Sequence, residues 1–312
     1  MPKSVPTTLH TRPFTRREAL TAGITRRELQ GKRFRRVFYG VYVCAGVPDS
    51  VAIRADAAAT LLPSSAVFRG LTSAALLDIP VPDPPLIEAV VPPGDRRART
   101  AGLRVTEHAL TPELFMTVHG RQLLVPELIF IDAAPRLQTE DLIVAGDALL
   151  NRGWTSLDLL ASATHSHHWP GVVAARDALP HLEPRAASPG ETRSRLALMQ
   201  LGFPRPRAGI VILDENGGWI AEVDMLIDDP PVVFQYDGEV HFASAQKRRS
   251  DAARDEGVRD LDWEVVILTK LDLRDRHRLD RRARAACERA AGRVPRGFTR
   301  QGRLPTLRAQ AS

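Results

Sequence analysis

Apolar and polar residues alternate most regularly between residues 188 and 275, and the pattern predicts the order helix, three strands, helix, strand. Ser188-Pro-Gly-Glu191 places a cap residue before a proline and a glutamate, as at the start of a helix. Asp214-Glu-Asn-Gly217 is a strong turn signal between two apolar strands. This order is typical of an α/β fold in which helices flank a mixed sheet. The predicted strands are residues 210–213, 219–227, 232–237 and 263–269, and the predicted helices begin at Ser188 and near Ser244.

The first fifty residues carry a second pattern, a repeated tetrad. Thr15-Arg-Arg-Glu18 and Thr25-Arg-Arg-Glu28 both have the spacing of a capping box, so each predicts the start of a short helix. Residues 34–43 are then expected to form a strand pair around Tyr39-Gly40. Two short helices followed by a hairpin indicate a small winged helix-turn-helix. Residues 1–13, with three prolines, are expected to be a flexible leader.

These patterns divide the chain into four parts. Helical and strand-like spacings mix in the second part, whose basic loop Arg96-Arg-Ala-Arg99 receives no role. A basic helix is expected from Asp272, acting as its cap, to about Ala291. The predicted domains are residues 1–50, a winged helix-turn-helix; 51–187, a mixed α/β domain; 188–291, the αβββαβ core; and 292–312, a disordered basic tail.

The sequence contains no apolar run long enough to span a membrane, and its start lacks the apolar segment of a secretory signal. A cytoplasmic location without a membrane partner is therefore predicted. Cys44 and Cys287 lie far apart and have no CxxC spacing. This spacing favours two inert thiols over a disulfide framework or a zinc site.

Positive charge is concentrated at the two ends of the chain. Residues 1–50 hold 10 Lys and Arg against 3 acidic residues, and residues 270–312 hold 13 against 4, whereas the chain between them is acidic. Two basic terminal segments favour a protein that binds a polyanion, because contacts to phosphate supply most of the non-specific affinity for nucleic acid. Solvated surface arginines are the alternative, since arginine outnumbers lysine 39 to 4.

Four arginines of the N-terminal part are candidate nucleic-acid-binding residues. Arg26 and Arg27 begin the second helix, where a recognition helix presents side chains to bases or phosphates, and Arg35 and Arg36 precede the hairpin turn. Exposed arginines without a ligand are the alternative. Continued through Gly40-Val-Tyr42, this stretch resembles the N-terminal domain of AbiEi-type antitoxins, which are transcriptional repressors in type IV toxin-antitoxin systems. The resemblance implies that the partner is DNA.

Acidic and amide side chains gather on two neighbouring strands of the core. Alternation along the first strand places Asp224 on the face opposite to Val223 and Met225. On the next strand Gln235 and Asp237 share a face, so the three polar side chains are expected to converge. Carboxylates held close together repel each other unless a cation neutralises them or a hydrogen-bond donor stabilises them. This requirement favours a functional site over a purely structural role.

Five short motifs accompany this order of elements: Glu191-Thr-Arg-Ser-Arg195, Val223-Asp224, Gln235-Tyr-Asp237-Gly238, His241 and Asp251-Ala-Ala-Arg254-Asp255. Together they resemble the PD-(D/E)xK nuclease superfamily, and most closely its domain of unknown function related to very-short-patch-repair endonucleases. The resemblance implies a restriction-endonuclease-like core. By the same resemblance, Asp224 corresponds to the metal-binding aspartate, Gln235 to the second acidic position and Glu191 to the acid carried by the helix.

The chain departs from the superfamily pattern at two positions. Gln235 stands where a glutamate is usual, and Asp237 stands where a lysine is usual. Gly238 permits a sharp turn that is expected to return His241 towards the same rim. An aspartate-glycine pair followed by a histidine or lysine is normal in the repair-like branch, so the resemblance implies that Asp237 and His241 supply what the lysine otherwise would. The expected cofactor is Mg²⁺ or Mn²⁺, held by Asp224 and Asp237 with help from Gln235. His241 would act as general base or orient the attacking water.

Glu191 and Arg195 complete the candidate catalytic and binding residues. Arg195 lies one helical turn beyond Glu191, where it can pair with that carboxylate or touch a phosphate. Helix capping explains Glu191 about as well as metal binding does. Asp251, Arg254 and Asp255 are expected to form a solvated polar face.

The sequence therefore predicts a DNA-binding protein whose Mg²⁺-dependent, endonuclease-like domain hydrolyses phosphodiester bonds. An antitoxin-like transcriptional regulator with a catalytically inactive nuclease fold is the alternative, and Gln235 favours it. A purely structural interaction module is a third interpretation, which predicts no salt-sensitive binding of DNA.

Overall fold

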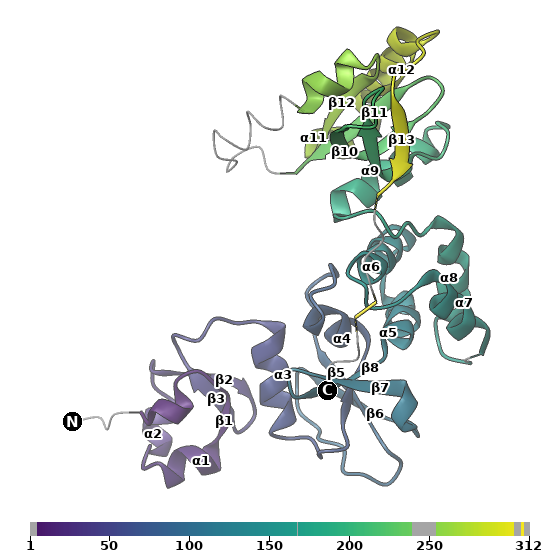
Figure 1. Ribbon diagram of the computed structural model, residues 1–312. Helices are drawn as coiled ribbons and strands as arrows, with labels where there is room; N and C mark the ends of the chain where they lie inside the picture. Colours follow the sequence, from purple (N-terminus) through teal and green to yellow (C-terminus); the bar gives the residue numbers. More distant parts are fainter. Residues whose placement is uncertain (1–4, 167, 239–253, 303–306, 309–312) are drawn as a thin grey trace. The chain divides into compact units, whose positions relative to one another are not determined.

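The computed structural model describes residues 5–166, 168–238, 254–302 and 307–308. These residues form an α/β fold, as the sequence pattern predicts (Figure 1). Within them the strands make three sheets, one of three antiparallel strands and two of five strands with both parallel and antiparallel neighbours. Of the helices in this part of the chain, none is both long enough and apolar enough to cross a membrane.

Two compact units make up the described chain. The first holds the residues before Gln138 together with Ser162–Arg176. The second holds Gln138–Ala161 and the described residues from Asp177 to Arg308. The boundary expected at residue 188 thus falls inside the second unit, because helix α6 (Thr139–Asn151) packs on helix α9 (Pro189–Gln200).

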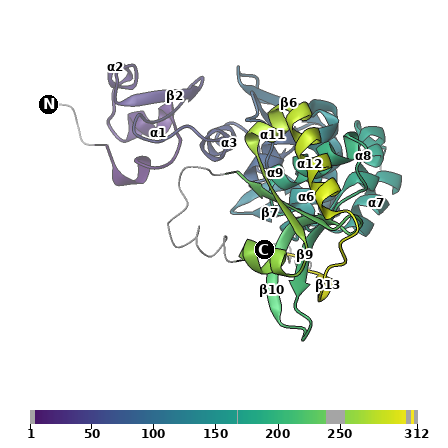
Figure 2. The same ribbon diagram turned by 90° about the horizontal axis from the view of Figure 1, so that it is seen from above.

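The N-terminal part folds as its tetrads predict, and Figure 2 shows α1 and α2 beside β2. In both Thr15–Glu18 and Thr25–Glu28 the threonine accepts a hydrogen bond from the glutamate N–H while the glutamate accepts one from the threonine N–H, so both capping boxes are complete. Phe14 and Phe34 meet edge to face with 5.8 Å between ring centroids. Leu9 is buried in the same core, so the expectation of a flexible leader is wrong there. The elements are η1 (Thr7–Leu9), β1 (Phe14–Thr15), α1 (Arg16–Thr21), α2 (Arg26–Leu29), β2 (Phe34–Phe38) and β3 (Val41–Cys44).

A five-stranded sheet in the order β6-β5-β4-β8-β7 organises the rest of the first unit. Strands β5 and β6 are parallel, and β6 lies at the edge of the sheet. The Arg69 guanidinium binds the buried carboxylate of Asp132, which also accepts a hydrogen bond from the Trp169 indole at 2.9 Å. The elements before residue 125 are α3 (Val51–Ala59), β4 (Val67–Phe68), α4 (Gly70–Leu76), β5 (Ile87–Val91), β6 (Leu103–Glu107), η2 (Pro112–Leu114), β7 (Phe115–Val118) and β8 (Arg121–Leu124). Those from residue 126 to residue 181, besides α6, are α5 (Pro126–Ala133), η3 (Ala134–Arg136), α7 (Leu157–Ser166), α8 (Val172–Ala178) and η4 (Leu179–His181).

The second unit has the predicted order of helix, three strands, helix and strand. Its sheet runs β12-β11-β10-β9-β13, with β11 and β12 parallel and the other neighbours antiparallel. Apolar residues of α9 and α12 cover one face of this sheet, and Val258, Leu261 and Trp263 cover the other. The strands are β9 (Arg207–Leu213), β10 (Trp219–Ile227), β11 (Val232–Asp237) and β12 (Glu264–Thr269), and a helix occupies residues 254–260.

The structure differs from the sequence prediction after β12. The expected single basic helix is two helices, α11 (Lys270–Arg274) and α12 (Arg276–Ala290), because Asp275 leaves the helical conformation and caps α12. Asp272 is not the first cap but the third residue of α11, where its carboxylate accepts the N–H of Thr269. The tail after Gly292 is not wholly disordered, since β13 (Phe298–Gln301) pairs with β9 and satisfies the backbone groups along that edge.

Candidate functional site

The regular alternation of side chains along β10 breaks at Asp224. Val223 packs in the hydrophobic cluster of its β9 partner Ile210, whereas Met225 packs in the cluster on the other face of the sheet. The prediction that Val223 and Met225 share a face is therefore wrong. Opposite the break, Gly209 of β9 has a φ of +56°, a left-handed conformation that glycine adopts without steric cost. A local twist of the β9–β10 pair thus accounts for the change of face at Asp224.

Next to this break, side chains join β10 and β11 in place of the regular backbone ladder. We call the place formed by Asp224 of β10 and by Gln235 and Tyr236 of β11 the fork. The paired register ends with Met225 opposite Phe234. Asp224 Oδ2 then accepts a hydrogen bond from the Tyr236 N–H at 2.6 Å, and Gln235 Oε1 accepts one from the Asp224 N–H at 3.3 Å. Each strand therefore sends a side chain to the backbone of the other. The expected convergence of Asp224 and Gln235 is confirmed.

Glu191 lies in the first turn of α9 and serves as part of its cap. Ser188 Oγ accepts the Glu191 N–H at 3.2 Å, and Glu191 Oε2 accepts the Ala187 N–H at 2.8 Å. Gly190 allows the helix start to rest on β11, since a Cβ added at this glycine would lie 1.8 Å from a ring carbon of Tyr236. A larger residue would push α9 away from the strand. Gly190 thus sets the position of Glu191 relative to the fork.

The charge of Asp224 at the fork acts on the carboxylate of Glu191. Burial, followed by the negative charge of Asp224, raises the pKa of Glu191 to about 7. Burial likewise raises the pKa of Asp224, although the hydrogen bond from the Tyr236 N–H opposes the rise. Desolvated carboxylates that repel each other are stabilised by a cation or by protonation of one of them. The fork is therefore a place where a divalent cation would lower the free energy of the ionised pair.

Arg254 and Asp255 act on the same carboxylate from the helix at residues 254–260. After burial, which is the largest influence on the pKa of Asp224, the charge of Arg254 lowers that pKa and the charge of Asp255 raises it. Both side chains are half-buried and Arg254 and Arg259 act on Asp255, so the expectation of a solvated, internally paired face stays a prediction for this pair, whereas Asp251 lies outside the described residues. Both residues belong to the segment Asp251-Ala-Ala-Arg254-Asp255 that the sequence singles out. In the sequence, the neighbouring charged residues of this helix favour a solvated, internally paired face for Arg254 and Asp255.

The fork does not bring every predicted ligand together. Asp237 is the last residue of β11 and is exposed, and His241 lies outside the described residues. In the described ranges no three His, Cys, Asp or Glu side chains lie close enough to form a metal-binding group. What the structure does bring together is Asp224 and Gln235, joined by a hydrogen bond, with Glu191 near enough for the charge of Asp224 to raise its pKa.

Arg195 is buried and unavailable to nucleic acid. Its side chain is 1% exposed, and its Nη2 lies 3.0 Å from Asp147 Oδ2 and 2.8 Å from the carbonyl oxygen of His181. Asp147 of α6, equally buried, also accepts the hydroxyl of Thr192 at 2.9 Å. The prediction that Arg195 touches a phosphate is therefore wrong, because Asp147 engages its guanidinium in the interior. No local feature of the sequence around residue 147 signals this pair.

The arginines of the N-terminal part form a second candidate site. Arg26 and Arg27 of α2 and Arg36 of β2 are exposed. Arg35 is half-buried, and its Nη1 lies 3.1 Å from Oδ1 of the exposed Asp49. Its Nη2 also donates to the carbonyl oxygen of Val47 at 3.2 Å, and because ion pairs at a surface are worth about 1 kcal/mol or less, Nη1 can exchange Asp49 for a phosphate while Nη2 keeps its partner. The residues predicted to bind nucleic acid are thus accessible in this part of the chain.

The arginines of α12 mostly serve the fold. Arg278 Nε binds the buried carboxylate of Asp272 at 2.9 Å, and Arg282 binds the other oxygen at 2.7 Å. Arg289 Nη2 pairs with Glu264 of β12 at 2.6 Å. Because these guanidinium groups tie the helix to its own sheet and to α11, the basic character of α12 is not evidence for a contact with DNA.

Comparisons with known proteins find relatives without a stated activity. No protein-family model matches the chain. The chain is similar to two uncharacterized proteins of Mycobacterium tuberculosis, MT2308 of strain CDC 1551 / Oshkosh and Rv2248 of strain ATCC 25618 / H37Rv, each 29% identical over 241 residues that make up 77% of this chain and 86% of the relative. The crystal structure of RV2827C protein from Mycobacterium tuberculosis is similar at a TM-score of 0.40 and 15% identity, over 59% of this chain and 75% of that chain. A likeness of this strength carries no argument about function, which has to rest on the fork and on the N-terminal arginines.

Proposed function

We propose that the protein binds DNA and that the fork hydrolyses phosphodiester bonds with the help of Mg²⁺ or Mn²⁺. The observation that supports this function best is the break between β10 and β11, where the Asp224 and Gln235 side chains each accept a backbone N–H of the opposite strand and where the charge of Asp224 raises the pKa of Glu191. Burial disfavours the charged forms of both carboxylates, although each also accepts a backbone N–H. Unfavourable ionisable pairs of this kind are concentrated at functional sites.

The side chains at the fork suit a hard divalent cation. Mg²⁺ prefers carboxylate and carbonyl oxygens and keeps several of its waters, so it does not need a complete cage of protein ligands. Glu191 and Asp224 would hold the ion together with the amide oxygen of Gln235, which already lies across the fork from Asp224. When bound, the cation would neutralise charge on the phosphoryl oxygens and help to activate a water.

Arg254 is the residue at the fork best suited to hold the phosphate itself. Its charge acts on Asp224, so the guanidinium lies near the place where a phosphodiester would meet the carboxylates. A guanidinium can donate two parallel hydrogen bonds to phosphate oxygens. In this proposal Arg254 supplies the positive charge of the lysine that Asp237 replaces, and His241 is retained as the candidate general base.

The partner is proposed to be DNA because the N-terminal helix pair and hairpin leave Arg26, Arg27 and Arg36 exposed. Side chains at the start of the second helix of such a motif reach base edges or phosphates. Arg35, whose ion pair is at the surface, would add a phosphate contact after exchanging its partner.

A second function is supported by a specific observation at the fork. Gln235 contributes no negative charge, and Asp237 is exposed at the strand end. A site with two carboxylates binds a divalent cation more weakly than a site with three or four. An antitoxin-like transcriptional regulator with a catalytically inactive nuclease fold would have such a site, and its DNA binding would still depend on the N-terminal arginines.

Nicking of supercoiled plasmid in the presence of Mg²⁺ or Mn²⁺ distinguishes the two functions. The test variant is Asp224→Asn, which keeps an oxygen for the Tyr236 N–H and removes the charge. Glu215→Gln, at a side chain that is 61% exposed in the β9–β10 turn, is the matched control. The nuclease function predicts metal-dependent nicking by the wild type and the control, and a rate lower by roughly 100-fold in Asp224→Asn.

A gel shift on the same protein preparations completes the test. If the wild type does not nick but binds DNA, and Arg26→Ala/Arg27→Ala weakens that binding, the regulator is supported and the nuclease is rejected. If the wild type neither nicks nor shifts DNA at low salt, both functions are rejected.

A further inference from the structure

A basic pocket opens at the edge of the sheet in the first unit, outside the residues used so far. Its volume is about 370 Å³. Thr100 forms an antiparallel bridge with Leu103, and Arg97 Nε lies 3.0 Å from Glu107 Oε1, at the far end of β6. The segment at residues 97–100 therefore runs back alongside the edge strand β6. The space between this segment and the strand is the pocket.

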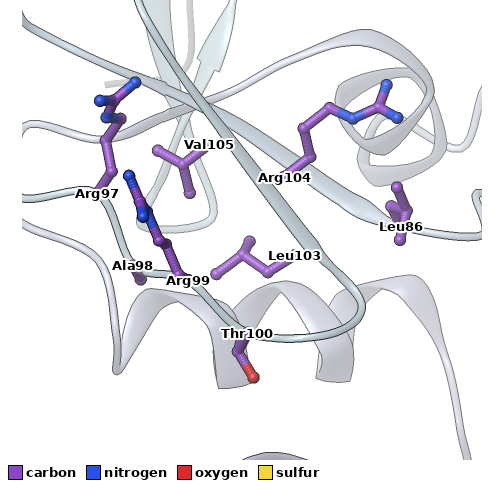
Figure 3. Close-up of a pocket in the computed structure, with 8 residues that line it drawn as sticks. All are labelled: Leu86, Arg97, Ala98, Arg99, Thr100, Leu103, Arg104 and Val105. Atoms are coloured by element: carbon purple, nitrogen blue, oxygen red, sulfur yellow. The ribbon is translucent and has the colours of Figure 1, made fainter.

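Two guanidinium groups flank an apolar floor in this pocket. Figure 3 shows Arg97 and Arg99 extending from the same wall towards the side of β6 that carries Leu103 and Val105, whereas the Arg104 side chain leaves the strand on the opposite side. The two arginines of the first wall are two residues apart in an extended segment, which places them on the same side of the chain. None of the residues that line the pocket is acidic.

The positive charge at the pocket is only partly neutralised. Arg97 has an exposed partner in its ion pair, and such pairs contribute little. Arg104 lies 3.4 Å from Glu88 Oε1, but Arg136 lies closer to the same oxygen, at 2.9 Å. Arg99 is exposed, and the ion pairs and hydrogen bonds found among the described residues do not involve it. The pocket can therefore offer the two guanidinium groups of Arg97 and Arg99 to an anion.

We propose that this pocket binds a phosphate of a nucleic-acid strand, with the adjoining sugar against Leu103 and Val105. Guanidinium groups bind phosphate oxygens through paired, charge-assisted hydrogen bonds, and the exposed ion pair of Arg97 with Glu107 can be exchanged for such bonds. The apolar floor between the arginines matches the alternation of charged phosphate and apolar sugar along a strand. The proposal shares the nucleic-acid partner with the proposed function, but it does not depend on cleavage at the fork.

Fluorescence anisotropy with the full chain and labelled oligonucleotides, single-stranded and duplex, tests the pocket across a range of salt concentrations. The test variant is Arg97→Ala/Arg99→Ala. Arg96→Ala is the matched control, because Arg96 is exposed in the same loop and does not line the pocket. Each phosphate contact contributes about 0.9 to the slope of log K against log salt concentration, so the test variant should lower that slope by about 1 to 2 and weaken binding roughly tenfold. The control should change the slope by less than half as much.

The outcomes separate the pocket from the N-terminal site. Equal effects of the test variant and Arg96→Ala would overturn the pocket proposal. It would also be overturned if inorganic phosphate or a nucleoside monophosphate displaced the oligonucleotide at an equal concentration of phosphate groups, since the pocket would then serve a small ligand. If Arg26→Ala/Arg27→Ala alone weakens binding, the N-terminal site stands and the pocket fails. If only the pocket variant weakens binding, the pocket stands and the N-terminal site fails.

Discussion

Replacing Glu191 by glutamine removes the charge of this side chain and keeps an oxygen that can accept the Ala187 N–H. In the wild type, burial and then the charge of Asp224 raise the pKa of Glu191 from 4.5 to about 7. Above that pH the folded protein carries an ionised carboxylate that is less favourable than in the unfolded chain. We therefore expect Glu191→Gln to be more stable than the wild type at pH 8 in the absence of divalent cations.

The sign and size of this effect follow from proton linkage. Because the folded pKa lies above the unfolded value, the folded state binds more protons between pH 4.5 and pH 7, and the free energy of unfolding falls as pH rises through this window. One pKa unit corresponds to about 1.4 kcal/mol, so the shift is worth about 3 kcal/mol at most. The loss of unfolding free energy due to Glu191 is absent below pH 4.5 and complete above about pH 7. The Glu191→Gln variant should not show this contribution, because its side chain does not titrate.

Urea unfolding at pH 5 and at pH 8 in the presence of EDTA measures the effect. Trp263 is buried in the hydrophobic cluster beside β10, so tryptophan fluorescence reports on the second unit once Trp169 of the first unit is replaced by phenylalanine in every variant compared. The exposed-site variant Glu215→Gln should follow the wild type. The reasoning is refuted if the wild type and Glu191→Gln lose the same free energy of unfolding between the two pH values. Adding Mg²⁺ should reduce the loss in the wild type, because a bound cation would stabilise the ionised pair.

Two further changes test how the surroundings of the fork are held. Gly190→Ala brings a methyl group against the Tyr236 ring and should lower the free energy of unfolding by about 1–3 kcal/mol, and an unchanged urea midpoint would show that α9 is not held against β11 in this way. Arg195→Met leaves the buried Asp147 without its cation and should lower the free energy of unfolding by about 3–5 kcal/mol. Arg193→Met removes the partly exposed ion pair with Asp141 and should lower it by about 1 kcal/mol or less. Equal urea midpoints for the two arginine variants would contradict the buried pairing.

Local features of the fold were predictable from the sequence because they depend on residues three or four positions apart. The Thr15–Glu18 and Thr25–Glu28 capping boxes form as their spacing requires. The same holds for the Ser188 cap of α9 and for the turn between β9 and β10. The two residues of the fork that face each other across strands, Asp224 and Gln235, followed from alternation combined with a correct order of strands.

The remaining features depend on contacts between distant parts of the chain. The change of face at Asp224 arises opposite Gly209 on the neighbouring strand, and a periodic pattern along one strand does not contain that information. The pairing of Arg195 with Asp147 joins two helices that the sequence assigned to different domains. The break between α11 and α12 at Asp275 depends on a local cap, but the continuous run of charged residues around Asp275 gives no sign of it in the sequence.

Calorimetric titration of Mn²⁺ into the full chain tests most directly whether Glu191 and Asp224 jointly hold a divalent cation. We predict one Mn²⁺ per wild-type chain, binding weakened at least about tenfold in both Glu191→Gln and Asp224→Asn, and no change in Glu215→Gln. Near pH 7 the wild type should also release protons on binding, because Glu191 is partly protonated there. Absence of binding, or equal affinity in the wild type and both fork variants, would contradict the assignment.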